Sequence, residues 1–417
     1  MLKSKIVADD RVHFDLMAAA RRNPFSGLSK NTYLLGLASL FADVSTEMLY
    51  PVLPIFLTET LGAKPAILGL VEGIAQALQN IVQGLSGWLA DTLQRRKPVA
   101  LVGYLVSALS KPFIGLSTSW TGVLAARSMD RLGAGSRSAP RDALIAASAA
   151  EKDRGKAFGL EGIGDNLGAF LGPLITILLV ASFHVTLRTI FLLAVIPGLI
   201  AAGMVFLVRE TPVAVRSKAK LDAHVRHFPR DYWKYVFVIL LFSLGNSSNT
   251  FLILRTKDLG TPLTTTILIY AFFNLVAALA SFPAGYLSDK FGRKGVLLVG
   301  FLVFAIVYAA FGFATHTVLL AGLFVLYGVY QGIFRTVGKA LATDFLPPEL
   351  HASGIGWYTA AVGLATLVAS LVAGQLWTRA GPPAAFLYGA ILAGVGTLAL
   401  VWLVPNRRSP ARAWPRL

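Results

Sequence analysis

The sequence predicts an all-α polytopic membrane protein with twelve transmembrane helices in two pseudo-symmetric six-helix halves. The 417 residues are 55% hydrophobic and only 14% charged, with a mean hydropathy of +0.65, whereas soluble domains carry about 25% charged residues. Apolar runs long enough to cross a bilayer recur along the whole chain, and one charged motif occurs at corresponding places in its two halves. These observations exclude a soluble enzyme, a disordered scaffold and a secreted disulfide-rich domain.

Each span is predicted from length and apolarity. A helix needs about 20 apolar residues to cross the hydrocarbon core. We expect the spans near residues 33–57, 66–90, 97–117, 120–142, 157–182, 187–208, 233–256, 264–287, 295–314, 317–342, 353–378 and 384–404. The chain then divides into a cytoplasmic N-terminal segment 1–32 without a removable signal peptide, a first half 33–208, a linker 209–232, a second half 233–404 and a tail 405–417.

The basic residues predict the orientation. The chain has 38 Lys and Arg against 21 Asp and Glu, a formal net charge of +17, and most basic residues lie in segments on the side of the two termini. By the positive-inside rule we expect both termini in the cytoplasm, in the cytoplasmic (inner) membrane of a bacterium. Because the charge is dispersed over short segments and not gathered in one patch, it does not indicate nucleic-acid binding.

The sequence lacks the usual signatures of an enzyme. It contains no Cys, which excludes disulfides, iron–sulfur clusters and thiolate metal sites. It also lacks the H-E-x-x-H, G-x-S-x-G and Walker motifs. We therefore expect no enzymatic activity, no cofactor and no metal site.

A ten-residue motif is repeated 198 residues further along the chain. Gly87-Trp-Leu-Ala-Asp91-Thr-Leu-Gln-Arg95-Arg96 recurs as Gly285-Tyr-Leu-Ser-Asp289-Lys-Phe-Gly-Arg293-Lys294. The same offset matches two further basic pairs, Arg137 with Arg335 and Arg141 with Lys339. Duplicated halves around a central site are the architecture of secondary transporters.

The repeated motif resembles the loop motif of the major facilitator superfamily, which joins helices 2 and 3 and again helices 8 and 9. The resemblance covers about residues 30–405 and is to proton-coupled, antiporter-like bacterial members. It implies that family's fold, alternating access, and a gating role for Gly87, Asp91, Arg95, Arg96, Gly285, Asp289, Arg293 and Lys294. The alternative is that these basic residues only set the topology.

Acidic residues within the spans are the candidates for proton coupling. An ionisable side chain in a span costs at least about 2.5 kcal/mol on insertion scales, so each is a candidate functional residue, and acids occur only in the spans of the first half. Asp43 and Glu47 share one helical face near the bilayer midplane. Neighbouring carboxylates in a low dielectric resist simultaneous ionisation, so we expect them to carry protons. The alternative is an ion pair with Arg127 or Arg131.

The fourth and fifth spans extend this set. In the resembled family an arginine of the fourth helix is implicated in proton transfer; Arg127 occupies the matching place, and Arg131 and Asp130 lie close by. The arginines would alternatively bind an anion. Asp165 is a second candidate protonation site. The segment 137–142 is expected to be scaffold at the cytoplasmic end of the fourth helix.

The fifth span also carries a glycine motif. Gly164, Gly168, Gly172 and Pro173 resemble the family's antiporter motif, which favours export. Glycines at intervals of four residues let another helix approach closely, so packing without directional meaning is the alternative.

Polar residues within the spans are the candidate substrate ligands: Glu72, Gln76, Asn246, Asn249, Asn274, Gln331 and Arg335. The leading hypothesis is proton-coupled export of a small organic or amphipathic molecule. The alternative is proton-coupled uptake of an organic anion or metal chelate bound by Arg127, Arg131 and Arg335, and a non-transporting receptor or scaffold is a remote third. The expected partners are the small-molecule substrate, protons and lipid, and the chain is expected to function as a monomer.

Overall fold

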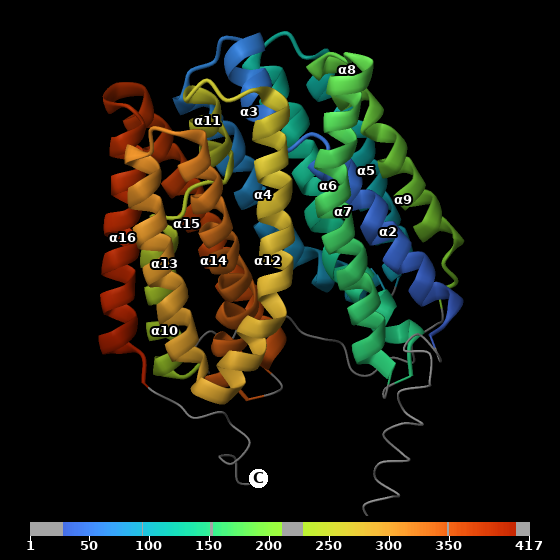
Figure 1. Ribbon diagram of the computed structural model, residues 1–417. Coiled ribbons are helices and arrows are strands. Elements are labelled where there is room, and N and C mark those ends of the chain that lie inside the picture. The colour runs from blue at the N-terminus through green and yellow to red at the C-terminus, as the bar shows by residue number, and fades with distance from the viewer. Residues whose placement is uncertain (1–27, 94, 151–152, 211–227, 348–349, 406–417) are drawn as a thin grey trace, which may run out of the picture.

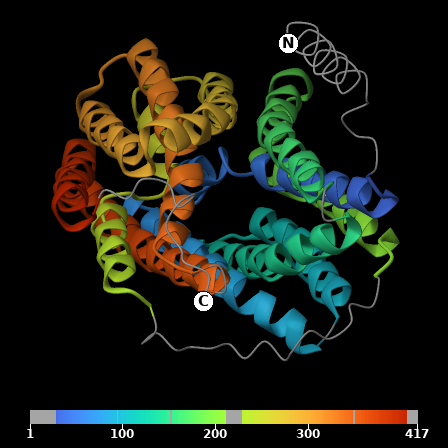
Figure 2. The same cartoon turned by 90° about the horizontal axis from the view of Figure 1, so that it is seen from below.

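Two helical bundles stand side by side in the computed structural model (Figures 1 and 2). It describes residues 28–93, 95–150, 153–210, 228–347 and 350–405, apart from the side chains of residues 87–93 and 352. The first bundle contains α2 (Lys30–Glu47), α3 (Leu53–Ile55), the π-helical turn η1 (Phe56–Thr60), α4 (Pro65–Leu93), α5 (Arg96–Leu116), α6 (Trp120–Ser148), α7 (Arg154–Phe183), α8 (Leu187–Leu193) and α9 (Val195–Leu207). The second contains α10 (Arg230–Ser243), α11 (Thr250–Asp258), α12 (Leu263–Phe291), α13 (Arg293–Phe313), α14 (Thr317–Asp344), α15 (His351–Ala380) and α16 (Pro382–Leu403).

The predicted all-α membrane fold is confirmed. Within the described ranges there is no strand, and nine helices are long and apolar enough to cross a membrane. The predicted spans near 33–57, 120–142 and 233–256 are not among the nine. The second of these corresponds to α6, which carries several charged residues, and the other two are interrupted helices.

The two interruptions lie opposite each other in the middle of the molecule. The first span breaks between α2 and α3, where Pro51 cannot donate a backbone hydrogen bond. The seventh breaks between α10 and α11, in a run of Asn and Ser residues whose side chains compete for backbone hydrogen bonds. The hydroxyl groups of Tyr50 and Ser248 are 3.4 Å apart and join the two breaks.

The repeat shifts by one residue after its motif. A Cβ atom added to Gly135 of α6 would lie 2.6 Å from the carbonyl oxygen of Gln79 in α4. At Gly332 of α14 the same addition would lie 2.8 Å from the carbonyl oxygen of Ala277 in α12. Gly135 and Gly332 are therefore counterparts at an offset of 197 residues, while Gln79 and Ala277 keep the offset of 198.

The shift arises in the connection that holds the motif. Helices α4 and α12 begin at Pro65 and Leu263, an offset of 198, whereas α5 and α13 begin at Arg96 and Arg293, an offset of 197, and Gly292 alone separates α12 from α13. Its φ of 95° lies in the region that favours glycine, which lets the chain turn within one residue. The offset of 198 matched Arg335 with Arg137 and Lys339 with Arg141, and both matches are wrong. The structural counterpart of Arg335 is Ser138, and that of Lys339 is Asp142.

The bundles are in close contact at the upper end of the molecule in Figure 1, where α3 and α11 lie. The backbone amide of Ala66 in α4 donates a hydrogen bond of 3.0 Å to the hydroxyl of Thr378 in α15. Lys257 Nζ of α11 lies 3.5 Å from Glu59 Oε1 of η1. These contacts join the two bundles at the upper end, so any wide opening between them lies toward the lower end, where α9 and α16 finish.

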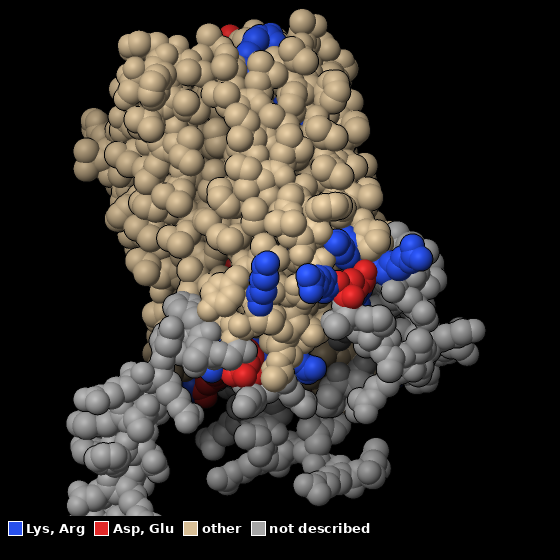
Figure 3. Space-filling view, turned by 90° about the vertical axis from the view of Figure 1, so that its right-hand side faces the viewer, with Lys and Arg blue, Asp and Glu red and all other residues tan. Residues whose placement is uncertain are grey.

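The outer surface is consistent with a bilayer around the molecule. Figure 3 shows charged side chains gathered at the lower end of one face, below a wide band of other residues. Large apolar side chains are strongly exposed in the described chain; Phe282 is 84% and Val318 is 86% exposed. Soluble proteins rarely leave extended apolar surface in water, whereas lipid would cover it.

Candidate functional site

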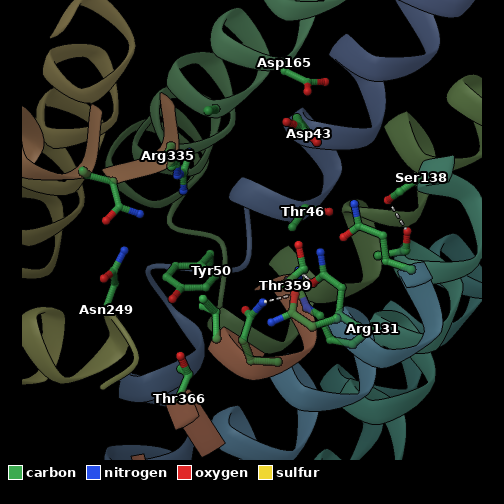
Figure 4. A pocket seen from close by; sticks show the side chains of 18 of the residues that line it. Asp43, Thr46, Tyr50, Arg131, Ser138, Asp165, Asn249, Arg335, Thr359 and Thr366 are labelled. Atoms are coloured by element: carbon green, nitrogen blue, oxygen red, sulfur yellow. Dashed lines mark hydrogen bonds between the residues drawn. The ribbon is translucent and has the colours of Figure 1, made fainter. Parts of the chain in front are cut away.

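A cavity of about 640 Å³ lies between the bundles. Its walls come from α2, α4, α6 and α7 on one side and from α12, α14, α15 and the break between α10 and α11 on the other. Its lining includes Lys339, and Figure 4 shows Tyr50, Thr366, Ser138 and other lining residues around it. This volume is in the range of sites for small organic ligands.

Six of the seven residues predicted to bind substrate line this cavity: Gln76, Asn246, Asn249, Asn274, Gln331 and Arg335. The seventh, Glu72, is 3% exposed and is not part of the lining. Of the residues predicted to couple protons, Asp43, Glu47, Arg131 and Asp165 line the cavity, whereas Arg127 and Asp130 do not. The roles of the lining residues remain predictions.

Arg127 is the centre of an ion-pair network behind the cavity wall. Its Nε lies 2.9 Å from Glu72 Oε1 and its Nη1 lies 3.0 Å from Asp130 Oδ2. Arg131 Nε lies 3.3 Å from the same Asp130 oxygen, and Ser107 Oγ donates to the other Asp130 oxygen at 2.7 Å. Arg127 and Asp130 have no exposed surface. The network therefore joins α4, α5 and α6 in the interior of the first bundle.

Asp43 pairs with a different arginine from those predicted. Its Oδ1 lies 4.0 Å from Arg137 Nη2. The expected alternative, an ion pair of Asp43 or Glu47 with Arg127 or Arg131, is wrong in this structure, because those arginines are engaged by the acids of the buried network.

The segment predicted as scaffold contributes two arginines to the cavity wall. Arg137 and Arg141 both line the cavity. Arg141 Nη2 lies 2.7 Å from Glu161 Oε1, and its Nη1 lies 3.6 Å from Asp165 Oδ1. Their spacing of four residues, which places both on one helical face, was the sequence signal that would have indicated a shared role.

Glu47 is held by side chains of the opposite bundle. Tyr270 donates a hydrogen bond of 2.9 Å to Glu47 Oε2, and Asn274 Nδ2 lies 3.5 Å from the same oxygen. The ring of Tyr50, in the break that follows α2, stacks on Tyr270 with centroids 5.4 Å apart. A carboxylate of the first bundle thus accepts hydrogen bonds from α12 of the second, at the cavity.

Lys111 is a buried cation to which the sequence assigned no role. It is 1% exposed, and its Nζ donates hydrogen bonds to Ser45 Oγ and, at 3.4 Å, to Thr46 Oγ1 of α2. Ser45 in turn donates to the carbonyl of Ala194, where α8 meets α9. The lysine therefore connects α5 to α2 one turn before the break in the first span.

Arg335 and Lys339 of α14, unlike the arginines of α6, have no close carboxylate partner in the described ranges. When its amide oxygen faces Arg335, Gln331 accepts hydrogen bonds from Nε at 3.1 Å and from Nη2 at 3.3 Å. Across the described ranges, neither Arg335 nor Lys339 has a carboxylate oxygen within 4.0 Å. Figure 4 shows Arg335 and Arg131 entering the cavity from opposite walls.

The second copy of the repeated motif makes contacts at the lower end. Arg293 lies 3.7 Å from Asp289 Oδ1, forms an ion pair with Asp344 and donates to the carbonyl of Ala340 at 2.7 Å. Lys294 donates to backbone carbonyls at the end of α16. A Cβ atom added to Gly285 would lie 3.5 Å from the methyl carbon of Thr336 in α14.

In the first copy, the carboxylate of Glu210 accepts a hydrogen bond of 2.6 Å from the backbone amide of Arg96, while Arg95 precedes α5. The surroundings of Gly87 and the side chain of Asp91 lie outside the described part of the structure. The gating role of both copies stays a prediction.

The glycine motif of α7 packs against α2. A Cβ atom at Gly168 would lie 2.6 Å from the carbonyl oxygen of Leu40, and one at Gly172 would lie 2.9 Å from that of Val44. Gly164 makes an equally close contact with α2, and Pro173 is buried. The glycines thus allow the close approach that places Asp43 beside α7; the structure does not test their predicted relation to export.

Comparison with known proteins identifies the family. The model of the Major Facilitator Superfamily matches residues 35–255 and 235–416. An uncharacterized MFS-type transporter of Methanocaldococcus jannaschii is 35% identical over 382 residues, covering 90% of this chain and 95% of the relative. An uncharacterized MFS-type transporter of Bacillus subtilis is 27% identical over 398 residues, covering 92% of this chain and 97% of the relative.

Solved structures show the same fold. The nucleoside transporter NupG aligns with a TM-score of 0.75 at 15% identity, covering 91% of this chain and 100% of that chain. A bacterial homologue of the human lysosomal transporter Spinster, in an inward-facing and unoccupied conformation, aligns with a TM-score of 0.69 at 16% identity, covering 90% and 95%. The chain therefore belongs to the major facilitator superfamily and is a multi-pass membrane transporter, not an enzyme.

Proposed function

We propose that the chain is a proton-coupled secondary transporter that moves a small organic molecule by alternating access. The observation that carries this proposal is the position of Asp43, Glu47 and Asp165 on the wall of the cavity between the bundles. A carboxylate in such a place exchanges protons with the cavity water and also influences how the bundles contact each other. Ionisable groups inside membrane spans are commonly part of proton pathways.

Glu47 supplies a link between protonation and conformation. In its ionised form it accepts hydrogen bonds from Tyr270 and Asn274 of the opposite bundle. Hydrogen bonds to a charged group are stronger than those to a neutral one, so protonation weakens this contact. A ligand that changes the relative stability of two conformations shifts their populations, and here the ligand is the proton.

Asp43 and Asp165 supply a second link. Each carboxylate faces an arginine of α6, Arg137 at 4.0 Å and Arg141 at 3.6 Å. Protonation of Asp43 would leave Arg137 with a net positive charge toward the cavity, whereas protonation of Asp165 would leave Arg141 paired with Glu161 at 2.7 Å and remove one negative charge from the wall. Proton binding and substrate binding would then influence each other through the charge of one wall.

The direction and setting follow from sequence features. The resemblance of Gly168, Gly172 and Pro173 to an antiporter motif supports export, and the distribution of basic residues supports cytoplasmic termini in an inner membrane. One chain supplies both walls of the cavity, which supports a functional monomer.

Proton flux in proteoliposomes tests the proposal. Purified protein is reconstituted with an internal pH dye and supplied with a panel of small organic molecules. We expect a transported molecule to move protons across the wild-type membrane and Asp43→Asn to lose this flux. Asp258→Asn, a matched change outside the cavity lining at the end of α11, should retain it. Transport without proton flux, or unchanged flux in Asp43→Asn, would overturn the proposal.

A further inference from the structure

We infer that Arg335 and Lys339 of α14 form a subsite for an anionic group of the substrate, so that the transported molecule is a small organic carboxylate or phosphate ester. This inference rests on the proposed function, because it names the class of molecule that the cavity carries. It also selects between the two substrate classes that the sequence left open.

The two cations share one face of α14. They are four residues apart, both line the cavity, and both are exposed within the described structure. Residues at this spacing are neighbours on a helix surface, so one anionic group can contact both side chains. The guanidinium of Arg335 is oriented by the amide oxygen of Gln331 one turn earlier, and its remaining N–H groups are free to bind a ligand.

The charge balance separates these cations from those of the opposite wall. Each cavity arginine of the first bundle has a carboxylate partner: Arg131 with Asp130 at 3.3 Å, Arg137 with Asp43 at 4.0 Å and Arg141 with Glu161 at 2.7 Å. In the described ranges Arg335 and Lys339 have none within 4.0 Å. The wall formed by the second bundle thus carries two cations without a close ion pair, and the acids that act on them from a greater distance are Glu47 and Asp142 of the first bundle.

The duplicated fold does not require cations at these positions. The structural counterparts of Arg335 and Lys339 in the first bundle are Ser138 and Asp142, a hydroxyl and a carboxylate. The two cations are therefore a property of this cavity and not of the repeat.

A bound anion lowers the free-energy cost of enclosing the two cations when the cavity closes. In the open cavity, water surrounds the two cations; when the lower end closes, water leaves and two like charges remain in a poorly polar space. An unpaired buried charge is costly, and a paired one far less so. A bound anion neutralises the pair, so the loaded cavity closes more readily than the empty one.

A third donor faces the cavity from the first bundle. Arg131 lines the cavity and is only 9% exposed, and its Nη2 has no hydrogen-bond partner in the described structure. The two cations of α14 match a carboxylate or phosphate, whose oxygens accept several charge-assisted hydrogen bonds, and Arg131 adds positive charge on the opposite wall.

Ligand-dependent thermal stability tests the subsite without a proton gradient. The probes are matched pairs at fixed ionic strength: small carboxylates beside their amides, and phosphate esters beside their parent alcohols. A ligand that binds the folded state raises its apparent stability. We expect stabilising probes to be anionic, and we expect Arg335→Gln and Lys339→Gln each to weaken binding of such a probe about tenfold, ~1.4 kcal/mol.

Controls separate this result from a loss of folding or of transport. Lys64→Gln makes the same charge change at the exposed upper end and should bind like the wild type, and Arg335→Lys should recover part of the affinity. Each variant is first checked for an unchanged unliganded melting temperature. Equal stabilisation by the uncharged partners, no stabilisation by any anionic probe, or full affinity in the double variant Arg335→Gln/Lys339→Gln would overturn the subsite. Failure of proton coupling alone would leave anion binding intact.

Discussion

The two bundles share one fold but fill their interiors with different chemistry. The first contains the ion-pair network of Glu72, Arg127, Asp130 and Arg131. The second contains stacked aromatic rings, among them Phe242 and Phe301, whose centroids are 3.7 Å apart. Both interiors support helices of similar length in the same order.

This difference shows that the fold needs filled volume between helices and not a particular chemistry. Buried ion pairs contribute little to stability compared with well-packed apolar side chains. The predicted role of Arg127, Asp130 and Arg131 in proton coupling stays a prediction. Three substitutions would sharpen the contrast.

Removing the central charge of the first bundle has the largest expected effect. Arg127→Leu leaves Glu72 buried without its cation, and Asp130 loses one of its two. Breaking a buried pair in this way costs about 3–5 kcal/mol. We expect a strong fall in the melting temperature of the purified protein. Arg127→Leu combined with Glu72→Gln, which removes the stranded charge, should recover much of the loss; a single variant as stable as the wild type would contradict the network's importance.

The glycine contact between α7 and α2 has the next largest expected effect. In Gly168→Ala the added methyl group would meet the backbone of Leu40 at 2.6 Å and Asp43 Cβ at 2.7 Å, so the helices must separate. Overpacking of this kind costs about 1–3 kcal/mol. Gly159→Ala is the matched control, because nothing lies within 4 Å of its added Cβ. Thermal unfolding should distinguish them, and equal stability of the two variants would show that the helix contact is not tight.

Changing the aromatic interior has the smallest expected effect. Phe242→Leu keeps an apolar but smaller side chain at this buried position and removes the stacking on Phe301. Such aromatic contacts are worth about 0.5–1.5 kcal/mol beyond their apolar burial. We expect a modest loss of thermal stability and no change in proton flux. A loss of thermal stability as large as that of Arg127→Leu would show that the two interiors are equally sensitive to substitution.

Several features of the site were predictable because they depend on local pattern. Hydrophobic runs predicted the spans, and the spacing of Asp43 and Glu47 placed both on a face that does line the cavity. Amides in otherwise apolar predicted spans, such as Asn246 and Asn274, were predicted as substrate ligands for the same reason, and both line the cavity. The pattern did not distinguish Glu72 from them, because a carboxylate within a span is equally stable beside a cavity or beside a buried arginine.

The sequence by itself determined the membrane class, the duplicated halves and the concentration of acids in the first half. Only the tertiary structure decided which acid meets which arginine, and that Arg335 corresponds to Ser138. The physical reason is the geometry of the helix: one residue turns a side chain by about 100°. After a one-residue difference between the two halves, a comparison at the old offset therefore matches side chains that lie on different helical faces. The hydrophobic pattern that predicts the spans stays almost unchanged.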